Sequence, residues 1–156
     1  MQRKISKDTP LAEVTFRKYE KPTALSKRDL VRKICLSIGL LQPGDSRDVI
    51  VDVFYTLLTS KEPLTSTEIE KKVIEIRKEQ SLPLHGIAPS NIRRQILRLK
   101  DMLLLERVGN YYRLNENSYL TDIFVDKLEK YLLESIMSRI KEYMKEADKV
   151  FELKNV

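Results

Sequence analysis

Residues 89–114 read PSNIRRQILRLKDMLLLERVGNYYRL. Apolar side chains recur at helical spacing in the first half of this stretch: Ile92, Ile96, Leu99 and Leu103. Pro89 suits the first turn of a helix, where its missing N–H costs no hydrogen bond. In the second half, Gly109-Asn110 separates two short apolar and aromatic runs, as in a two-residue β-hairpin loop. The stretch predicts a helix from about Pro89 to Met102, followed at once by strands at 104–108 and 111–114.

The preceding segment, residues 45–58, predicts another helix. Its apolar residues recur three or four positions apart: Val49, Ile50, Val53, Phe54, Leu57 and Leu58. Their β-branching also suits a strand, but the polar residues Asp48, Asp52 and Thr56 fall four apart, which favours a helix. Asp45 or Ser46 is the expected cap of this helix.

A third helix is predicted after Pro63, with Thr65, Ser66 or Thr67 as its cap. Its inward side chains are Ile69, Val73 and Ile76, and charged residues occupy the other positions. Residues 81–88 contain Pro and Gly and form the connection to the helix at Pro89.

The N-terminal part of the chain carries weaker signals. Residues 1–10 show no periodicity and read as a mobile basic arm. Residues 14–19 contain β-branched and aromatic side chains and predict a short strand that ends before Pro22. A helix capped by Ser26 follows, and Gly39 together with Pro43-Gly44 closes it.

A long helix is predicted from Ser118 to about residue 150, because no Pro or Gly follows Gly109 and apolar residues form a wide stripe. Roughly thirty helical residues span about 45 Å. That length exceeds the width of a domain built from the preceding hundred residues, so part of the stripe lacks a partner within the chain. An exposed apolar stripe of this size indicates a homodimer that pairs through this helix.

The positive charge is unevenly distributed along the chain. The protein has 156 residues and a net charge of +6. Residues 1–33 hold ten basic and four acidic residues, and residues 87–113 hold six basic and two acidic ones. Residues 45–79, in contrast, hold six basic and eight acidic residues. The asymmetry indicates a polyanionic partner, although a Lys- and Glu-rich surface that only maintains solubility is the competing interpretation.

Three helices followed directly by a hairpin resemble a winged helix-turn-helix domain over Ser46–Leu114. Residues 63–69 resemble the opening of that family's second helix, residues 90–99 its recognition helix and residues 103–114 its strand-wing-strand unit. The chain is most similar to prokaryotic, especially archaeal, winged-helix transcriptional regulators. The connection over residues 81–88 departs from the family, because it is longer than the tight turn usual there.

The resemblance implies a recognition helix that reads duplex DNA, and the residue types on the predicted helix fit this role. With the apolar stripe facing inward, the opposite face is expected to display Asn91, Arg94, Gln95 and Arg98, which can bond base edges in the major groove. The full set of expected DNA-binding residues is Ser90, Asn91, Arg93, Arg94, Gln95, Arg98, Lys100, Arg107, Asn110 and Arg113. Of these, Arg93 and Lys100 lie on the flanks, toward the phosphates. The last three belong to the wing, where alternation sends one of Tyr111 and Tyr112 outward and the other into the core.

Outside the predicted DNA-binding region, basic residues near the start of the chain are candidates for extending contacts to the phosphates: Arg3, Lys4, Lys7, Arg17, Lys18, Lys27, Arg28, Arg32 and Lys33. A solvated or disordered tail explains the first three equally well.

No motif indicates catalysis, a cofactor or a metal. The sequence has no Gly-rich phosphate loop, no nucleophile elbow and no zinc-protease His pair. His85 is expected to be a surface or loop residue and Cys35 a small buried one. A single Cys and a single His make neither a disulfide nor a structural zinc site. No run approaches the roughly 20 apolar residues of a membrane span, and residues 1–7 do not resemble a secretory signal.

These observations predict a mainly α (α+β) protein in three parts. Residues 1–44 form a basic segment with one helix, residues 45–115 a winged helix, and residues 116–156 a dimerisation helix. The favoured function is a cytoplasmic, nucleoid-associated homodimer that binds double-stranded DNA and regulates transcription. Two alternatives stay open: a winged-helix protein-interaction module of a larger complex, and an RNA-binding or RNA-processing factor. An enzyme is the least supported function.

Overall fold

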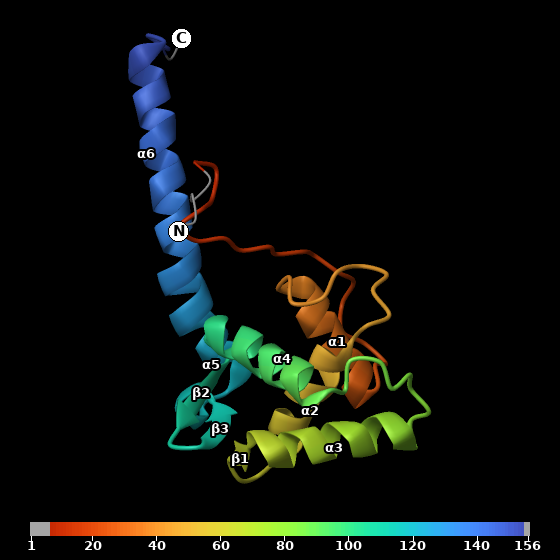
Figure 1. The fold of residues 1–156 in the computed structure, drawn as a ribbon. Coiled ribbons are helices and arrows are strands. Elements are labelled where there is room, and N and C mark those ends of the chain that lie inside the picture. The colour runs from red at the N-terminus through yellow and green to blue at the C-terminus, as the bar shows by residue number, and fades with distance from the viewer. Residues whose placement is uncertain (1–6, 155–156) are drawn as a thin grey trace.

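The computed structural model describes residues 7–154 and is mainly helical, with one small three-stranded antiparallel sheet. The α+β class predicted from the sequence is therefore confirmed. The elements follow the chain as α1 (Lys27–Ser37), α2 (Val49–Thr59), β1 (Leu64–Thr65), α3 (Ser66–Glu79), α4 (Pro89–Asp101), β2 (Leu105–Val108), β3 (Tyr111–Leu114), the 3₁₀ turn η1 (Asn115–Asn117), α5 (Leu120–Ile123), the π-helical stretch η2 (Phe124–Leu133) and α6 (Glu134–Val150). Figure 1 shows α1 to α4 and the sheet packed together, with α6 extending away from them.

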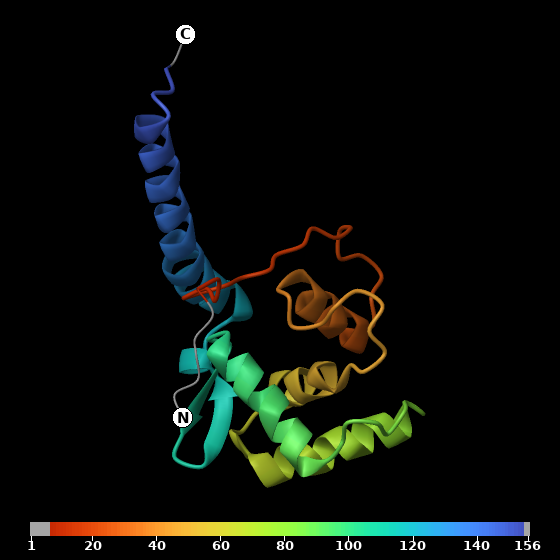
Figure 2. The same ribbon diagram turned by 45° about the horizontal axis from the view of Figure 1, so that its top comes forward.

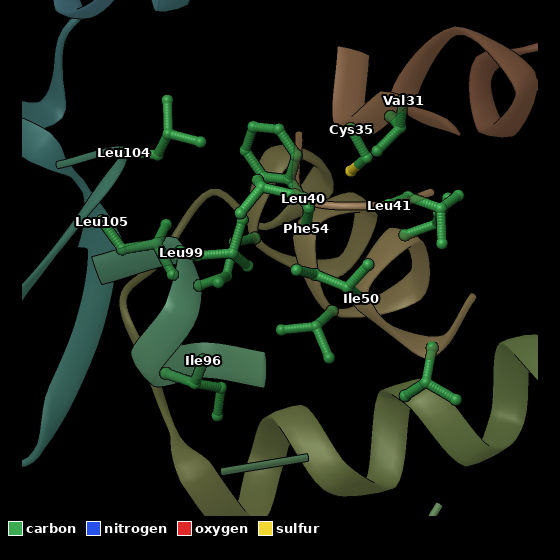
Figure 3. Close-up of a cluster of buried hydrophobic side chains, with 14 of the residues drawn as sticks. Val31, Cys35, Leu40, Leu41, Ile50, Phe54, Ile96, Leu99, Leu104 and Leu105 are labelled. Atoms are coloured by element: carbon green, nitrogen blue, oxygen red, sulfur yellow. The ribbon is translucent and has the colours of Figure 1, made fainter. Parts of the chain in front are cut away.

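Helix α2 lies at the centre of the hydrophobic core. Eight of its residues are buried, and α1, α3 and α4 all pack against it. Figure 3 shows Phe54 of α2 among Leu40, Leu99 and Leu104, which come from three other parts of the chain. The buried residues form one continuous cluster, so α1 shares its core with α2.

The predicted helix α3, helix α4 and hairpin are confirmed by the structure. Thr65 caps α3 with a capping box, in which its hydroxyl accepts from the Glu68 N–H (3.2 Å) and the Glu68 carboxylate accepts from the Thr65 N–H (3.4 Å). The hairpin pairs Val108 with Tyr111 across a two-residue loop. Only Gly109 of that loop has a positive φ (+62°), as the first central position of a type II′ turn requires.

The sheet has the order β1-β3-β2. Strand β1 is only two residues long, but it pairs Leu64 with Tyr112 and so joins the start of α3 to the hairpin. The path from α4 into β2 is fixed by a Schellman motif, in which the Leu104 N–H donates to the Leu99 carbonyl (3.1 Å). Leu103 adopts the left-handed conformation at this point (φ 64°).

The expected strand at 14–19 is wrong, because the described structure contains no strand before Leu64. Residues 11–25 have no regular secondary structure and pair with no strand, and Figures 1 and 2 show this segment running across the molecule before α1. It is held by the Arg17 N–H, which donates to Ser37 (2.8 Å), and by ring contact between Phe16 and Phe124 at 5.7 Å. The Arg17 guanidinium donates to the carbonyl of Leu36 in the last turn of α1 (2.7 Å) and to the carbonyl of Leu41 after the helix (3.2 Å).

The start of α2 also differs from the sequence expectation. The helix begins at Val49 with Asp48 at its N-cap position, not with Asp45 or Ser46. The Asp48 side chain makes no capping bond because it faces inward toward arginines of α1 and α3. The polar series Asp48, Asp52 and Thr56, which indicated a helix, is therefore buried and not a solvated face.

The C-terminal helix runs without interruption from Leu120 to Val150, close to the predicted range. Its first part, α5 and η2, packs on the core through Ile123 and Leu128, whereas α6 has no buried residue at all. Figures 1 and 2 agree that α6 projects away from the other elements. Within residues 7–154, no helix combines the length and the apolar character that a membrane crossing demands.

Candidate nucleic-acid interface

Helix α4 has a buried side and a fully exposed side. Ile92, Ile96 and Leu99 are buried in the core, as the sequence predicted. The exposed residues from Ser90 to the end of the helix are Ser90, Arg93, Arg94, Leu97, Lys100 and Asp101. The outward face of α4, defined by these six residues, therefore carries three cations, one carboxylate and one aliphatic side chain.

Three of the four expected base-reading side chains do not lie on this outward face. Arg94 is exposed as predicted, but Asn91, Gln95 and Arg98 are half-buried, and the expectation that they face outward is wrong. Their flank of α4 packs toward the segment that joins α1 to α2, because the Arg98 Nη2 donates to the Leu40 carbonyl at 2.7 Å.

The same three side chains form a hydrogen-bonded row along α4. The Asn91 amide donates to the Gly86 carbonyl (2.6 Å), and the Gln95 amide donates to the Asn91 Oδ1 (3.1 Å). The Arg98 Nη1 in turn donates to the Gln95 Oε1 (2.9 Å). The row links the α3–α4 connection at Gly86 to Leu40, so it positions α4 from both sides.

The long connection between α3 and α4 is anchored at two points. Arg77, which is buried near the end of α3, donates from Nε to the Pro83 carbonyl (2.7 Å), and Asn91 holds Gly86 from the other side. Gly86 has a φ of +83°, and a Cβ there would lie 3.0 Å from the Asn91 amide nitrogen. These two anchor points fix the position of α4, although the connection is longer than a tight turn.

The three polar residues predicted for the hairpin are placed differently from one another. Arg107 is exposed and folds over the turn, donating to the Gly109 carbonyl (2.7 Å) and to the Asn110 Oδ1 (3.2 Å). Arg113 instead forms an ion pair with Glu106 on the facing strand (2.8 Å). The hairpin therefore presents Arg107 and Asn110 at its tip, whereas the charge of Arg113 is offset by a carboxylate.

The two hairpin tyrosines follow the predicted alternation. Tyr112 packs against the core and pairs with Leu64, and Tyr111 is exposed beside Val108. Val108 and Tyr111 also line an open cleft next to Pro63 and Leu64.

Four of the seven described basic residues expected near the front of the chain have structural roles. Arg28 and Arg32 pair with Asp48, Arg17 bonds to backbone carbonyls, and Lys33 pairs with Glu20 (2.7 Å). The proposal that Arg17, Arg28, Arg32 and Lys33 are available to phosphates is not supported by these contacts. Lys7, Lys18 and Lys27 are exposed, and Arg3 and Lys4 lie outside the described residues.

The cations of α4 are less occupied than those of α1. Within residues 7–154, Arg94 and Lys100 have no ion pair. Arg93 approaches Glu70 of α3 at only 3.9 Å, and 64% of its side chain is exposed. With three cations and the single carboxylate of Asp101, the outward face of α4 therefore carries a net positive charge, as a surface that binds a polyanion requires.

A largely buried ion cluster lies between α1, α2 and α3 and is made of Arg28, Arg32, Asp48, Asp52 and Arg77. Asp52 is fully buried and accepts from the Arg28 Nε (2.9 Å) and the Arg77 Nη1 (2.6 Å). Asp48 accepts from all three arginines at 3.0–3.1 Å. The cluster joins α1, the start of α2 and the end of α3, and within the described chain its buried side-chain polar atoms all have partners.

The pKa of Asp48 reflects this environment. Burial alone raises the pKa of a carboxyl group, but the charges and hydrogen bonds of Arg28 and Arg77 outweigh it and hold the Asp48 pKa below its usual value. Asp48 is therefore ionised at neutral pH, and its ion pairs connect α1 and α3 to the start of α2.

The described residues show little that resembles a catalytic or metal centre. No group of three or more His, Cys, Asp or Glu side chains within residues 7–154 has the arrangement of a metal site. Cys35 is buried as predicted, and burial raises the pKa of its thiol to about 12, which makes it unreactive. His85 is exposed in the α3–α4 connection, as expected.

Sequence reasoning missed the ion cluster and the exposed position of Leu97. The only signal for the cluster was the four-residue spacing of Asp48, Asp52 and Thr56 on an otherwise apolar helix, which does not identify partners 16 to 29 positions away. The signal for Leu97 was its distance from the buried stripe of α4.

Comparison of the chain with known protein families, curated proteins and solved structures finds no match.

Proposed function

We propose that the protein is a winged-helix protein that binds double-stranded DNA as a homodimer and regulates transcription. The order of elements from α2 to β3 supports this proposal, because helix, strand, two helices and a two-stranded hairpin follow one another as in a winged helix. Pairing of β3 with both β1 and β2 places the hairpin beside the start of α3.

The observation that carries the proposal is the charge on the outward face of α4. Arg94 is exposed, lies at the position most opposed to the core and has no ion pair within the described chain. Arginine bonds guanine through two N–H groups in the major groove, so Arg94 is the best candidate for reading a base. Arg93 and Lys100 flank it and suit contacts to phosphates.

The hairpin adds a second contact region. Arg107 and Asn110 at its tip are exposed, and the Arg107 guanidinium is held over the turn by the Gly109 carbonyl. A cation fixed in this way suits a phosphate or the minor groove. Among the residues predicted from the sequence, Ser90, Arg93, Arg94, Lys100, Arg107 and Asn110 are thus retained as the DNA-binding set.

The exposed stripe of the C-terminal helix supports a homodimer. Eight large apolar or aromatic side chains are exposed on η2, on α6 and in the residues just after α6: Tyr131, Met137, Ile140, Tyr143, Met144, Val150, Phe151 and Leu153. At 150–250 Å² for a large side chain, they expose on the order of 1,000 Å². A stable interface buries about 800 Å² on each partner, so a second copy of this helix would account for the stripe.

The binding test uses the intact protein, a library of random duplex DNA and titrations at increasing salt. We expect affinity to fall as salt rises, because bound phosphates release counterions. Arg94→Ala should weaken binding to a selected duplex by about 5- to 150-fold, the loss of one bidentate base contact. Lys145→Ala, which removes one positive charge from α6, is the matched control and should leave the affinity unchanged.

Two outcomes would overturn the proposal: binding that does not respond to salt, or binding that is equally strong after Arg94→Ala. A duplex RNA of the same length separates the RNA-binding alternative, which predicts that RNA competes better than DNA.

One observation favours the protein-interaction alternative. Leu97 is 52% exposed in the middle of the outward face, where an aliphatic side chain gains little from a polar DNA groove but fits a protein surface. Under this alternative, Leu97→Ser releases a stoichiometric partner protein from the purified complex, whereas DNA binding is absent even at low salt.

A further inference from the structure

A polar cleft of about 500 Å³ lies beside α4, on the flank that turns away from the outward face. Asn91, Gln95 and Arg98 form one wall, and the segment that joins α1 to α2 forms the other. The lining also includes the aliphatic side chains of Leu41 and Ile50. The volume is within the range of about 300–1,000 Å³ that small-molecule sites have.

The charged groups of the cleft are unequal in number. Arg47 and Arg98 both line it, against one carboxylate, Asp45. Neither arginine has an ion pair within residues 7–154, and one oxygen of Asp45 already accepts the Arg47 backbone N–H at 2.9 Å. Arg98 uses two hydrogen bonds, to Gln95 and Leu40, of the five that a guanidinium can donate.

We infer that this cleft binds a small organic anion. Arg98 and Arg47 hold its carboxylate or phosphate group, since arginine matches both groups with paired N–H donors. His85, at the edge of the cleft, adds a further group that can bond an anion.

Occupation of the cleft also lowers affinity for DNA, and this second half rests on the proposed function. An anion on Arg98 places negative charge on the flank of α4, next to the outward face that faces phosphates. The anion further competes for the guanidinium that bonds the Leu40 carbonyl, which is the contact that holds α4 against the segment after α1.

The site itself is tested without DNA. The probes are benzoate and phenyl phosphate, with neutral benzamide as the matched control, titrated into ¹⁵N-labelled protein at constant ionic strength. We expect either anion to shift the side-chain amide signals of Asn91 and Gln95, and benzamide to bind at least about tenfold more weakly. The two anions distinguish a carboxylate site from a phosphate site.

Variants separate specific binding from a general charge effect. Arg98→Met should reduce anion affinity at least about tenfold. Because Arg98 also bonds Leu40, Arg47→Met, at an exposed side chain without such a bond, is the second variant and should weaken binding in the same direction. Arg139→Met on α6 is the charge-matched control. The site is overturned if neither anion shifts these amides at high millimolar concentration, or if Arg47→Met and Arg98→Met both bind like the unmodified protein.

The effect on DNA binding is tested by measuring the affinity for DNA in the presence of the anion that binds, benzoate or phenyl phosphate. The control is the affinity for DNA in the presence of benzamide. We expect the anion to weaken DNA binding and Arg47→Met to reduce that effect. Anion binding with unchanged DNA affinity overturns the regulation but keeps the site. Failure of the protein to bind any DNA overturns the proposed function and the regulation, whereas the amide shifts still decide the site.

Discussion

At the scale of single residues, the molecule depends on charges that are inside it. Arg77 and Asp52 are both buried and bond each other at 2.6 Å, and Asp48 connects them to α1. Removing one member of such a cluster leaves a buried charge without a partner, which typically costs about 3–5 kcal/mol. The cluster therefore fixes how α1, α2 and α3 meet.

The lowered pKa of Asp48 predicts loss of stability in acid. The ordinary pKa of this carboxyl is 3.8, and the folded value lies below it. The unfolded chain therefore takes up the proton first as the pH falls, so the stabilisation is complete above pH 4 and is lost progressively below it. Urea unfolding between pH 7 and pH 2 measures this, with Asp48→Asn as the comparison. The variant should be less stable at pH 7 and lose less stability in acid, and parallel pH profiles would contradict the prediction.

Gly39 is required by both its backbone and its neighbour. Its φ is +77°, and a Cβ there would lie 2.8 Å from the Thr15 Cβ and 2.9 Å from the Thr15 carbonyl oxygen. Gly39→Ala should lower the free energy of unfolding by about 1–2 kcal/mol from backbone strain, and further by displacing the segment that carries Arg17. Gly44→Ala is the matched control, because Gly44 has a φ of +79° but no atom within 4 Å of its added Cβ. Equal losses in the two variants, measured by thermal unfolding, would refute a role for the Thr15 contact.

At the scale of elements, local signals were sufficient where neighbouring residues in the sequence decide the structure. The cap at Thr65, Pro89 at the start of α4 and Gly109 in the hairpin all act within four residues of their position. The sequence predicted the last two directly and offered Thr65 as one of three possible caps. The strand expected at 14–19 failed because a strand needs a partner strand. Those residues are held instead by the end of α1 through Arg17.

The candidate site was predictable only in part for the same reason. The inward side of α4 follows from the helical period, but the use of its flanks depends on contacts far along the chain. Arg98 is hydrogen-bonded to Leu40, 58 positions away. Because of this contact, the row of Asn91, Gln95 and Arg98 lies against the segment after α1 and not on the outward face. Arg94, whose surroundings are solvent, is the one member of the predicted reading face that the local pattern placed correctly.

The capping box gives a prediction for α3. Thr65→Ala removes the hydroxyl that accepts the Glu68 N–H, so we expect a loss of about 1 kcal/mol in the free energy of unfolding. Because Thr65 also belongs to β1, the hairpin should become more mobile, which amide hydrogen exchange at Tyr111 would detect. Thr67→Ala is the control, because Thr67 lies two residues further along the chain and is exposed. An unchanged stability for Thr65→Ala would show that the cap does not contribute.

At the scale of the whole molecule, the fold divides the chain into a part that forms the core and a part that is exposed. The elements from α1 to η2 contribute all of the buried residues, whereas α6 contributes none. Met137, Ile140, Met144, Ala147 and Phe151 are spaced alternately by three and four positions, as residues at a helix–helix contact are.

Ile140→Glu should therefore weaken self-association and leave the unfolding of the monomer unchanged. Ile140 is 49% exposed on the stripe, and a charge buried at a helix pair would raise the dimer dissociation constant by at least about tenfold. Ser138→Glu adds the same charge at an exposed position of α6 on the opposite side and is the control. Sedimentation equilibrium over a range of concentrations gives the constant. A monomeric unmodified protein, or equal constants for the two variants, would be inconsistent with pairing through α6.

The absence of any buried residue in α6 has a consequence for how this sequence tolerates change. Substitutions there leave the core intact, so a damaged copy would still accumulate in the cell and pass quality control. If two copies pair through α6, the only defect of such a variant would be weaker dimerisation. Substitutions in the seventeen residues of α6 would then be selected only for their effect on dimerisation. After a gene duplication, a few substitutions in α6 would be enough to give two copies that each form homodimers and do not pair with each other.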